Sequence, residues 1–317
     1  MGTVVLSIDA ELAWGFHDLS QPPIKRIAAS RDGWTLTKSL LETHNIPATW
    51  AIVGHLYLEA CDGLHSTHPA GSQWFARDPG TDEARDPLWY GRSLIDSLRE
   101  SPVAHELACH TFSHLPIGDP GVPESAIRAD LTASQRAART CGVEPQSFIY
   151  PRNIVGRQEI LAEFGYTAYR PRWPRVIDDT PLRLPLKIIE TVAGRPVPIV
   201  YPWIDESGLV AIPPSMDIFG MNLPFVDIGD RIYTRVQQTL ERLIHTEGIM
   251  HLWFHPNGLV EKPQQSQLRG LLELIEEYRS QTAISIETMG TIADRVLADS
   301  SKVASPRRPV VDRLRKL

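Results

Sequence analysis

The sequence lacks any cysteine pattern that could form a disulfide framework or a C-x-x-C metal site. Its three cysteines, Cys61, Cys109 and Cys141, are scattered over 317 residues. An odd and unclustered set of this kind is typical of reduced thiols in a cytoplasmic protein. We therefore expect a cytoplasmic location.

Long apolar runs and an excess of positive charge are also missing. No stretch of about 18 apolar residues occurs, so no membrane-spanning helix is expected. The first residues show neither a basic segment nor an apolar stretch of signal length, and we expect no secretion signal. The net charge of −6 gives no electrostatic basis for binding nucleic acid. The hydrophobic content of 42% is instead ordinary for a soluble enzyme.

The C-terminal stretch 300–317 differs from the rest in composition. It holds six basic residues against one acid. This pattern predicts a flexible basic extension. Its two interpretations are a frayed end and a segment with weak attraction for an anionic membrane surface.

Short apolar runs with β-branched residues alternate along the chain with segments of helical periodicity. Strands are expected at residues 3–8, 48–53, 106–109, 147–150, 167–169, 249–254 and 283–285. Helices are expected at residues 33–43, 94–98, 123–141, 158–164, 231–245, 264–279 and 288–297. The alternation favours an α/β fold with a mostly parallel sheet, either a (β/α) barrel or a doubly wound sheet.

A long insertion at about 55–105 breaks the alternation. It is rich in glycine, proline and aromatic residues, without a clear period in its first part. Its aromatic residues argue against disorder. A loop of this length inside a domain is usually functional when it is ordered.

Polar residues of catalytic type follow four of the expected strands. They are Asp9 and Glu11, His110 and His114, Arg152, and His255. The carboxyl ends of parallel strands converge on one face of an α/β barrel. We therefore expect these side chains to share one cavity.

Two of these groups have the chemistry of a metal site. His110 and His114 share a face if their segment is helical or tightly turned, and neutral imidazoles are good ligands for zinc and its neighbours. Asp9 and Glu11 point the same way at a strand end. A catalytic zinc takes three protein ligands and leaves one position open. The two histidines and one carboxylate therefore predict a metal site, and the other carboxylate is left as a base.

The other two groups have candidate roles beside this site. His255 is interpreted as a proton donor to a leaving amine, and Arg152 as a bidentate clamp on a catalytic carboxylate. The alternatives are a partly buried histidine with a satisfied hydrogen bond and a plain surface arginine. The remaining eight histidines have no comparable pattern and are interpreted as structural or exposed.

Five segments, in this order, resemble the motifs of one family. They are residues 7–11, 48–54, 110–114, 147–153 and 252–255. The chain resembles the polysaccharide deacetylases, of the carbohydrate esterase family 4 type with a NodB homology domain. The resemblance implies a distorted (β/α)7 barrel. Here it would be a single domain over residues 1–299, with the insertion at about 55–105 and the basic tail after it.

Two positions depart from that family's pattern. The family usually has two adjacent aspartates in its first motif, the first a base and the second a metal ligand. This chain has Asp9 followed by Ala10, and the next acid is Glu11. Glu11 is the candidate ligand because it is longer by one methylene, with Asp9 as the alternative. The usual Trp–Asp pair is not evident, and Trp173 is its only candidate.

The resemblance implies a metal-dependent hydrolase that removes an N-acyl group, by preference N-acetyl, from an amino sugar or sugar conjugate. In that interpretation Glu11, His110 and His114 hold a divalent ion, Zn²⁺ first among the candidates. Asp9 is the base that Arg152 would hold in place. The acid is the histidine of the last motif, His255.

The substrate and the reaction leave several possibilities open. Trp74, Trp89 and Tyr90 of the insertion are candidates to stack on a sugar ring, or else they pin the loop to the barrel. Without a secretion signal, a small or lipid-linked cytoplasmic amino sugar is expected rather than a cell-wall polymer. The alternatives are a deformylase or cyclic-amide hydrolase of the same fold, a catalytically degenerate carbohydrate-binding protein, and an unrelated α/β protein.

Overall fold

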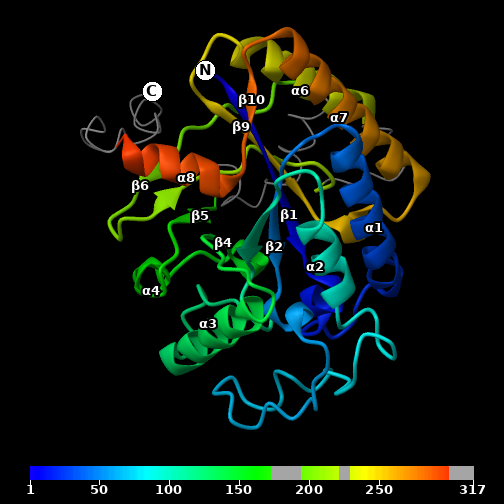
Figure 1. Cartoon of the computed structure of the whole chain (residues 1–317), viewed down its shortest axis with the longest axis vertical. Helices are drawn as coiled ribbons and strands as arrows, with labels where there is room; N and C mark the ends of the chain where they lie inside the picture. Colours follow the sequence, from blue (N-terminus) through cyan, green and yellow to red (C-terminus); the bar gives the residue numbers. More distant parts are fainter. Residues whose placement is uncertain (173–193, 221–228, 300–317) are drawn as a thin grey trace, which may run out of the picture.

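A computed structural model describes residues 1–172, 194–220 and 229–299, and its strands form one curved, mostly parallel sheet (Figure 1). The strand order is β6-β7-β5-β4-β3-β2-β1-β9-β8, and β10 also pairs with β1. The strands are β1 (Thr3–Ala10), β2 (Thr49–Ile52), β3 (Glu106–Cys109), β4 (Ser147–Ile149), β5 (Ala168–Arg170), β6 (Trp203–Ile204), β7 (Val210–Ala211), β8 (Met216–Asp217), β9 (Ile249–Phe254) and β10 (Ser285–Ile286). The antiparallel pair β6–β7 is the exception to the parallel pairing.

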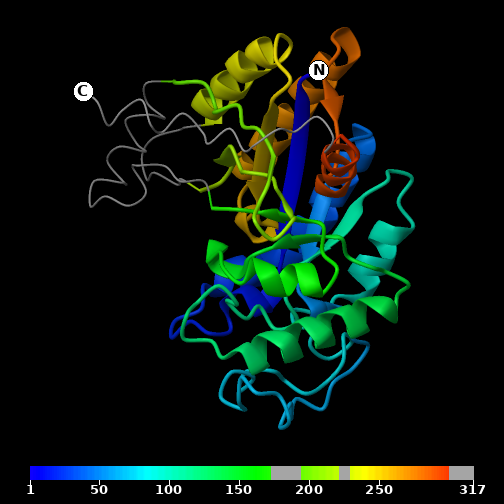
Figure 2. The same cartoon turned by 90° about the vertical axis from the view of Figure 1, so that its left-hand side faces the viewer.

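Helices surround the outside of this sheet (Figures 1 and 2). They are α1 (Ile24–Thr43), α2 (Arg92–Arg99), α3 (Glu124–Arg139), α4 (Gln158–Glu163), α6 (Gly229–Leu243), α7 (Lys262–Gln281) and α8 (Met289–Ala298). Short 3₁₀ turns follow several strands: η1 (Leu12–Phe16), η2 (Gly54–Tyr57), η3 (Pro151–Asn153) and η4 (Pro256–Gly258). The sheet curls into an incomplete barrel, which confirms the predicted distorted (β/α) barrel.

The central strand β1 explains why one end of the barrel carries the polar clusters. All eight of its residues are buried, because the strand has neighbours on both edges and packing on both faces. Its register pairs Ile8 with Phe254 of β9 and Ala10 with Ile52 of β2. Ile52 pairs in turn with Cys109 of β3. The residues that follow these strand ends therefore emerge at one edge.

The first helix begins earlier than its sequence pattern predicts. It starts at Ile24 and contains Gly33, where the sequence suggested a helix start. A β-carbon on Gly33 would lie 2.1 Å from the carbonyl oxygen of Pro256 in η4. The glycine therefore serves close packing of α1 on the turn after β9, and it does not mark a boundary.

The insertion is ordered and mostly irregular. Between η2 and α2 the chain forms turns and bends, with one isolated bridge between Ala60 and Asp82. We call residues 58–91 the insertion loop, and it lies below α3 in Figure 2. None of the described helices is long and apolar enough to cross a membrane. The basic tail 300–317 and Trp173 lie outside the described residues.

Candidate functional site

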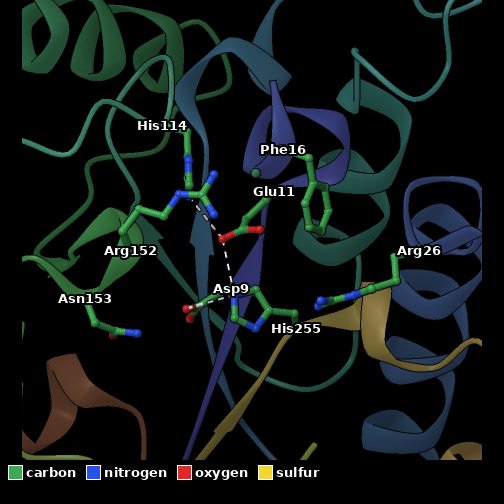
Figure 3. A pocket seen from close by; sticks show the side chains of 9 residues that line it. Asp9, Glu11, Phe16, Arg26, His114, Arg152, Asn153 and His255 are labelled. Atoms are coloured by element: carbon green, nitrogen blue, oxygen red, sulfur yellow. Dashed lines mark hydrogen bonds and ion pairs between the residues drawn. The ribbon is translucent and has the colours of Figure 1, made fainter. Parts of the chain in front are cut away.

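The strand ends bring the predicted polar residues into one pocket. Asp9 is near the end of β1 and Glu11 follows that strand, His110 comes directly after β3, and His255 directly after β9. The pocket has a volume of about 200 Å³. It is lined by Asp9, Glu11, Gly15, Phe16, Arg26, His114, Arg152, Asn153 and His255 (Figure 3).

Glu11 is the centre of the site. Its Oε1 lies 3.3 Å from His110 Nε2, 3.2 Å from His114 Nε2 and 3.2 Å from His255 Nε2. Figure 3 shows the Glu11 carboxylate between His114 and His255. Burial raises the pKa of Glu11, but the charges of His255 and His114 outweigh it and leave that pKa well below its usual value. The residue is therefore an ionised carboxylate among imidazoles.

The hydrogen bond at Nδ1 of His110 determines the tautomer of its neutral ring. Its Nδ1 lies 2.7 Å from the carbonyl oxygen of Ile149, which can only accept a hydrogen bond. In the neutral ring the proton is therefore on Nδ1, and Nε2 presents a lone pair to the Glu11 carboxylate. Such a backbone bond on the far nitrogen is the usual way to orient a metal-ligating histidine.

A strained turn places the second histidine beside the first. Thr111 and His114 have φ values of 61° and 59°, in the left-handed region that side chains disfavour. The buried Asp130 of α3 holds this turn. Its carboxylate accepts hydrogen bonds from the Phe112 backbone N–H and from the Ser113 hydroxyl, each at 2.5 Å. The histidine spacing thus depends on a helix that sequence reasoning did not connect with it.

The predicted clamp on Asp9 is made by a different arginine. Arg170, the last residue of β5, donates two hydrogen bonds to the Asp9 carboxylate, at 2.8 and 2.6 Å. Arg152 faces the pocket but pairs with Asp18. The assignment of the clamp to Arg152 is therefore corrected. Arg170 ends a strand like the other site residues, and this position was the signal that could have identified it.

The electrostatics keep Asp9 charged and His255 protonated in this arrangement. Burial raises the pKa of Asp9, but the charges of the Arg170 guanidinium and His255 lower it by more, so the pKa lies below its usual value. Burial lowers the pKa of His255, whereas Glu11, Asp9 and Asp217 raise it, with a result of about 9. Asp217, the last residue of β8, is a further acid that the sequence analysis missed.

The three aromatic candidates of the insertion do not line the pocket. Tyr90 is fully buried, and its hydroxyl accepts a hydrogen bond from the Thr81 backbone N–H at 2.9 Å. Trp89 packs edge-on against Trp14, with ring centroids 5.3 Å apart. Trp74 donates from Nε1 to Ser113 at 2.8 Å. These contacts correct the sugar-stacking assignment and support the alternative, in which the aromatic residues pin the loop to the barrel.

Comparison with known families identifies a related family over part of the chain. Residues 28–169 match the family model described as polysaccharide deacetylase. This stretch includes the histidine pair and Arg152, whereas Asp9, Glu11 and His255 lie outside it. The match confirms the resemblance to the polysaccharide deacetylases. No significant match was found among curated proteins.

Solved structures share the fold at low identity. A protein from Mycobacterium smegmatis described as a polysaccharide deacetylase is 19% identical with a TM-score of 0.63, and the alignment covers 98% of this chain and 94% of that one. A protein of the same description from Pseudomonas aeruginosa PAO1 is 12% identical with a TM-score of 0.63, covering 94% and 91%. The Puue allantoinase is 13% identical with a TM-score of 0.61, covering 93% and 90%. Similarity at this level shows the fold alone.

Proposed function

We propose that the protein is a metal-dependent hydrolase that removes an N-acyl group, by preference N-acetyl, from an amino sugar or sugar conjugate. One arrangement carries the proposal: His110 Nε2 lies 3.3 Å from the Glu11 carboxylate, while the Ile149 carbonyl oxygen takes the proton of the neutral ring at Nδ1. Two acceptors at this distance repel each other unless a cation or a proton lies between them. His114 Nε2 is a third candidate metal-ligand atom, and it lies 3.2 Å from the same Glu11 oxygen.

The spacing of these atoms fits a divalent ion. The ligand atoms of Glu11, His110 and His114 all lie within 4.8 Å of one another. The edges of a tetrahedral zinc site with nitrogen and oxygen ligands are roughly 3.3–3.5 Å long, as the bond lengths require. Imidazole and carboxylate ligands suit zinc and similar ions. When bound, the ion would polarise the acyl carbonyl and lower the pKa of a water molecule to roughly 7.

The chain's own residues would move the protons. Asp9 would accept a proton from the attacking water, held in place and kept ionised by Arg170. That pairing also makes Asp9 a weaker base. His255 would donate a proton to the amine nitrogen as the carbon–nitrogen bond breaks. Its Nε2 lies 3.6 Å from Asp9 Oδ2, so both groups reach the same reacting centre.

The pocket limits what part of the substrate can enter. Its volume of about 200 Å³ is below the roughly 300–1,000 Å³ of pockets that enclose drug-sized ligands. It therefore suits an acylamide group and the adjoining edge of one sugar. Phe16 offers an apolar wall. The exposed Arg26 donates from Nε and Nη2 to the Asn257 side chain, which leaves its Nη1 as a donor for substrate at the rim. We propose these two residues as substrate contacts in place of the insertion aromatics.

A second candidate is the hydrolysis of a cyclic amide. The similarity in fold to an allantoinase over 93% of this chain favours it. The same residues would serve, because ring opening also breaks an amide carbon–nitrogen bond. The two reactions differ in the product, which is free acetate in one case and a ring-opened acid in the other.

Elemental analysis beside product assays tests both proposals. We expect the purified chain to bind metal, and His110→Ala and Glu11→Gln each to lose one ion per chain relative to wild type. Asp9→Asn should keep that ion and lose hydrolysis. Loss of the ion in Asp9→Asn but not in Glu11→Gln would move the third ligand to Asp9. Acetate, formate and ring-opened product are assayed separately, and absence of all three with metal bound would contradict hydrolysis.

A further inference from the structure

A second cluster of metal-ligand side chains lies at the base of the insertion loop and shares no residue with the pocket lining. It consists of His55, Cys61, His65 and Asp78, whose ligand atoms all lie within 4.8 Å of one another. His55 belongs to η2, and the other three residues lie on the loop. From the sequence, both histidines were expected to be structural or exposed, and Cys61 a reduced thiol. Their spacing in the chain matches no standard metal motif, so only the fold reveals the cluster.

The separations are close to those of a tetrahedral site. Asp78 Oδ2 lies 3.0 Å from His55 Nε2 and 2.7 Å from His65 Nε2. Cys61 Sγ lies 3.3 Å from the same nitrogen of His65. Zinc with sulfur, nitrogen and oxygen ligands has tetrahedral edges of roughly 3.3–3.6 Å. To reach these edges, the Asp78–His65 pair would open by about 0.6 Å and the Asp78–His55 and Cys61–His65 pairs by about 0.3 Å each.

Hydrogen bonding alone does not account for this cluster. His55 is fully buried, and neither of its ring nitrogens has a partner in hydrogen-bonding geometry among the described residues. Buried polar groups nearly always have such a partner. His65 Nε2 faces both a carboxylate oxygen and a sulfur, although one N–H cannot serve both fully. A cation at the centre would satisfy both imidazoles.

The neighbouring hydrogen bonds leave Asp78 Oδ2 and Cys61 Sγ available to bind that cation. The other oxygen of Asp78 accepts from the Gly80 backbone N–H at 3.0 Å and from the Tyr90 hydroxyl at 3.5 Å. Cys61 Sγ accepts a hydrogen bond from the Gly63 backbone N–H at 3.4 Å, and a metal would bind this sulfur as the thiolate.

We propose that His55, Cys61, His65 and Asp78 form a closed structural zinc site, separate from the metal site of the pocket. Four protein ligands leave no open position, as is usual for a structural rather than a catalytic zinc. A ligand set of one thiolate, two imidazoles and one carboxylate suits zinc better than magnesium or calcium, which prefer oxygen ligands.

An ion in this second site would stabilise the turn that carries the histidines of the pocket site. The His55 backbone N–H donates to the carbonyl oxygen of Phe112 at 2.9 Å, inside the turn that carries His110 and His114. Trp74 of the insertion loop bonds Ser113 in the same turn. The loop has almost no regular backbone pairing, so an ion joining three of its residues to η2 would supply the order that secondary structure does not.

Cobalt substitution of the whole chain distinguishes the two sites. A thiolate bound to Co²⁺ gives a charge-transfer band in the near ultraviolet, and the pocket site contains no sulfur ligand. We expect the band in wild type and in Glu11→Gln, and its loss in Cys61→Ser. Cys141→Ser, which removes a buried free thiol elsewhere, is the matched control and should keep the band. Elemental analysis should give two zinc ions in wild type and one in each of Glu11→Gln and Cys61→Ser.

The spectrum of the cobalt-loaded wild-type chain tests the second zinc site even if Cys61→Ser fails to fold. A cobalt-loaded wild-type chain without a thiolate band would overturn the second site, whatever happens in the pocket. A thiolate band in a cobalt-loaded wild-type chain that yields none of the three assayed products would support the second site and leave the proposed function to fail alone. Hydrogen exchange provides an independent readout: backbone amides of residues 58–91 should exchange at least tenfold faster in Cys61→Ser than in Cys141→Ser.

Discussion

Arg170 and Asp9 form a buried bidentate ion pair, with the two guanidinium nitrogens 2.8 and 2.6 Å from the two carboxylate oxygens. The arginine also donates to the Ser7 hydroxyl at 3.0 Å and lies over the Trp253 ring, 4.4 Å from its centroid. These contacts fix the guanidinium plane, and the plane fixes the carboxylate. Asp9 is therefore held in one orientation by the neighbouring parts of the barrel wall.

Replacing Arg170 by lysine should lower hydrolysis by about 10²-fold while metal content stays at the wild-type level. Lysine keeps a charge but cannot make two parallel hydrogen bonds, so the base would lose its orientation. The measurement is kcat with elemental analysis on the same sample. Arg152→Lys is the comparison, since its pairing is with Asp18. A larger loss in Arg152→Lys than in Arg170→Lys would restore the assignment made from sequence.

The alternation of strands and helices was sufficient to predict a mostly parallel sheet, because each buried parallel strand is a nearly continuous apolar run, and the family resemblance selected the barrel over a doubly wound sheet. Boundaries were less accurate where glycine had a tertiary role. Gly33 resembles a helix boundary in sequence, yet it lies inside α1 because Pro256 approaches its α-carbon closely. Contacts of that kind join residues more than two hundred positions apart and leave no local signal.

The residues of the candidate site also fall into two groups, those that could be predicted from the sequence and those that could not. The residues directly after β1, β3 and β9 were predictable from one rule, the convergence of strand ends. Arg170 directly follows the strand expected at 167–169 and satisfies that rule, but it was not included among the candidates. Asp130, Cys61, His65 and Asp78 follow no strand-end pattern, whereas His55 comes shortly after β2 but was not included among the candidates. Only the packing of α3 and of the insertion loop brings these residues to the histidine turn.

Removing the Asp130 carboxylate should weaken both the fold and metal binding. In Asp130→Ala the buried Phe112 N–H loses its partner, which costs about 1–3 kcal/mol of unfolding free energy. The turn would then position His110 and His114 less well, and metal affinity should fall about 10–100-fold. Urea denaturation and a metal competition titration measure the two effects. Asp130→Asn keeps an acceptor for the N–H and should recover part of each; equal losses in both variants would contradict this role.

Acid should destabilise the protein through His251. This buried residue lies 3.1 Å from the Pro213 carbonyl oxygen through Nδ1 and 2.8 Å from the Ser7 hydroxyl through Nε2. Burial lowers its pKa, and the nearby Arg170 lowers it further, to about 3. The unfolded state takes up a proton near pH 6.5, while the folded state does so only near pH 3. Stability is therefore complete above pH 6.5 and falls as the pH drops towards 3, by at most about 1.4 kcal/mol per pH unit.

The variant His251→Gln isolates this contribution. It should be less stable than wild type at pH 7.5, because it alters the hydrogen bonds to Ser7 and Pro213. The difference between the two proteins should shrink as the pH falls from 6.5 to 5, since glutamine takes up no proton. Urea denaturation at several pH values measures it. A difference that stays constant over this range would show that His251 is not responsible.

The last prediction separates substrate contacts from loop anchors by their kinetics. Arg26 lines the pocket and is exposed to solvent, so Arg26→Gln should raise KM by about tenfold through loss of a charged hydrogen bond to substrate. Trp89 packs on Trp14 outside the pocket lining, and Trp89→Phe should leave KM unchanged while it lowers the unfolding free energy by about 1 kcal/mol. Arg26→Gln removes a charged hydrogen-bond donor, and Trp89→Phe removes part of an aromatic surface. A difference in KM between the two variants therefore shows which of the two side chains contacts the substrate. If Trp89→Phe raised KM and Arg26→Gln did not, the sugar would bind against the insertion loop, as the aromatic composition of that segment first suggested.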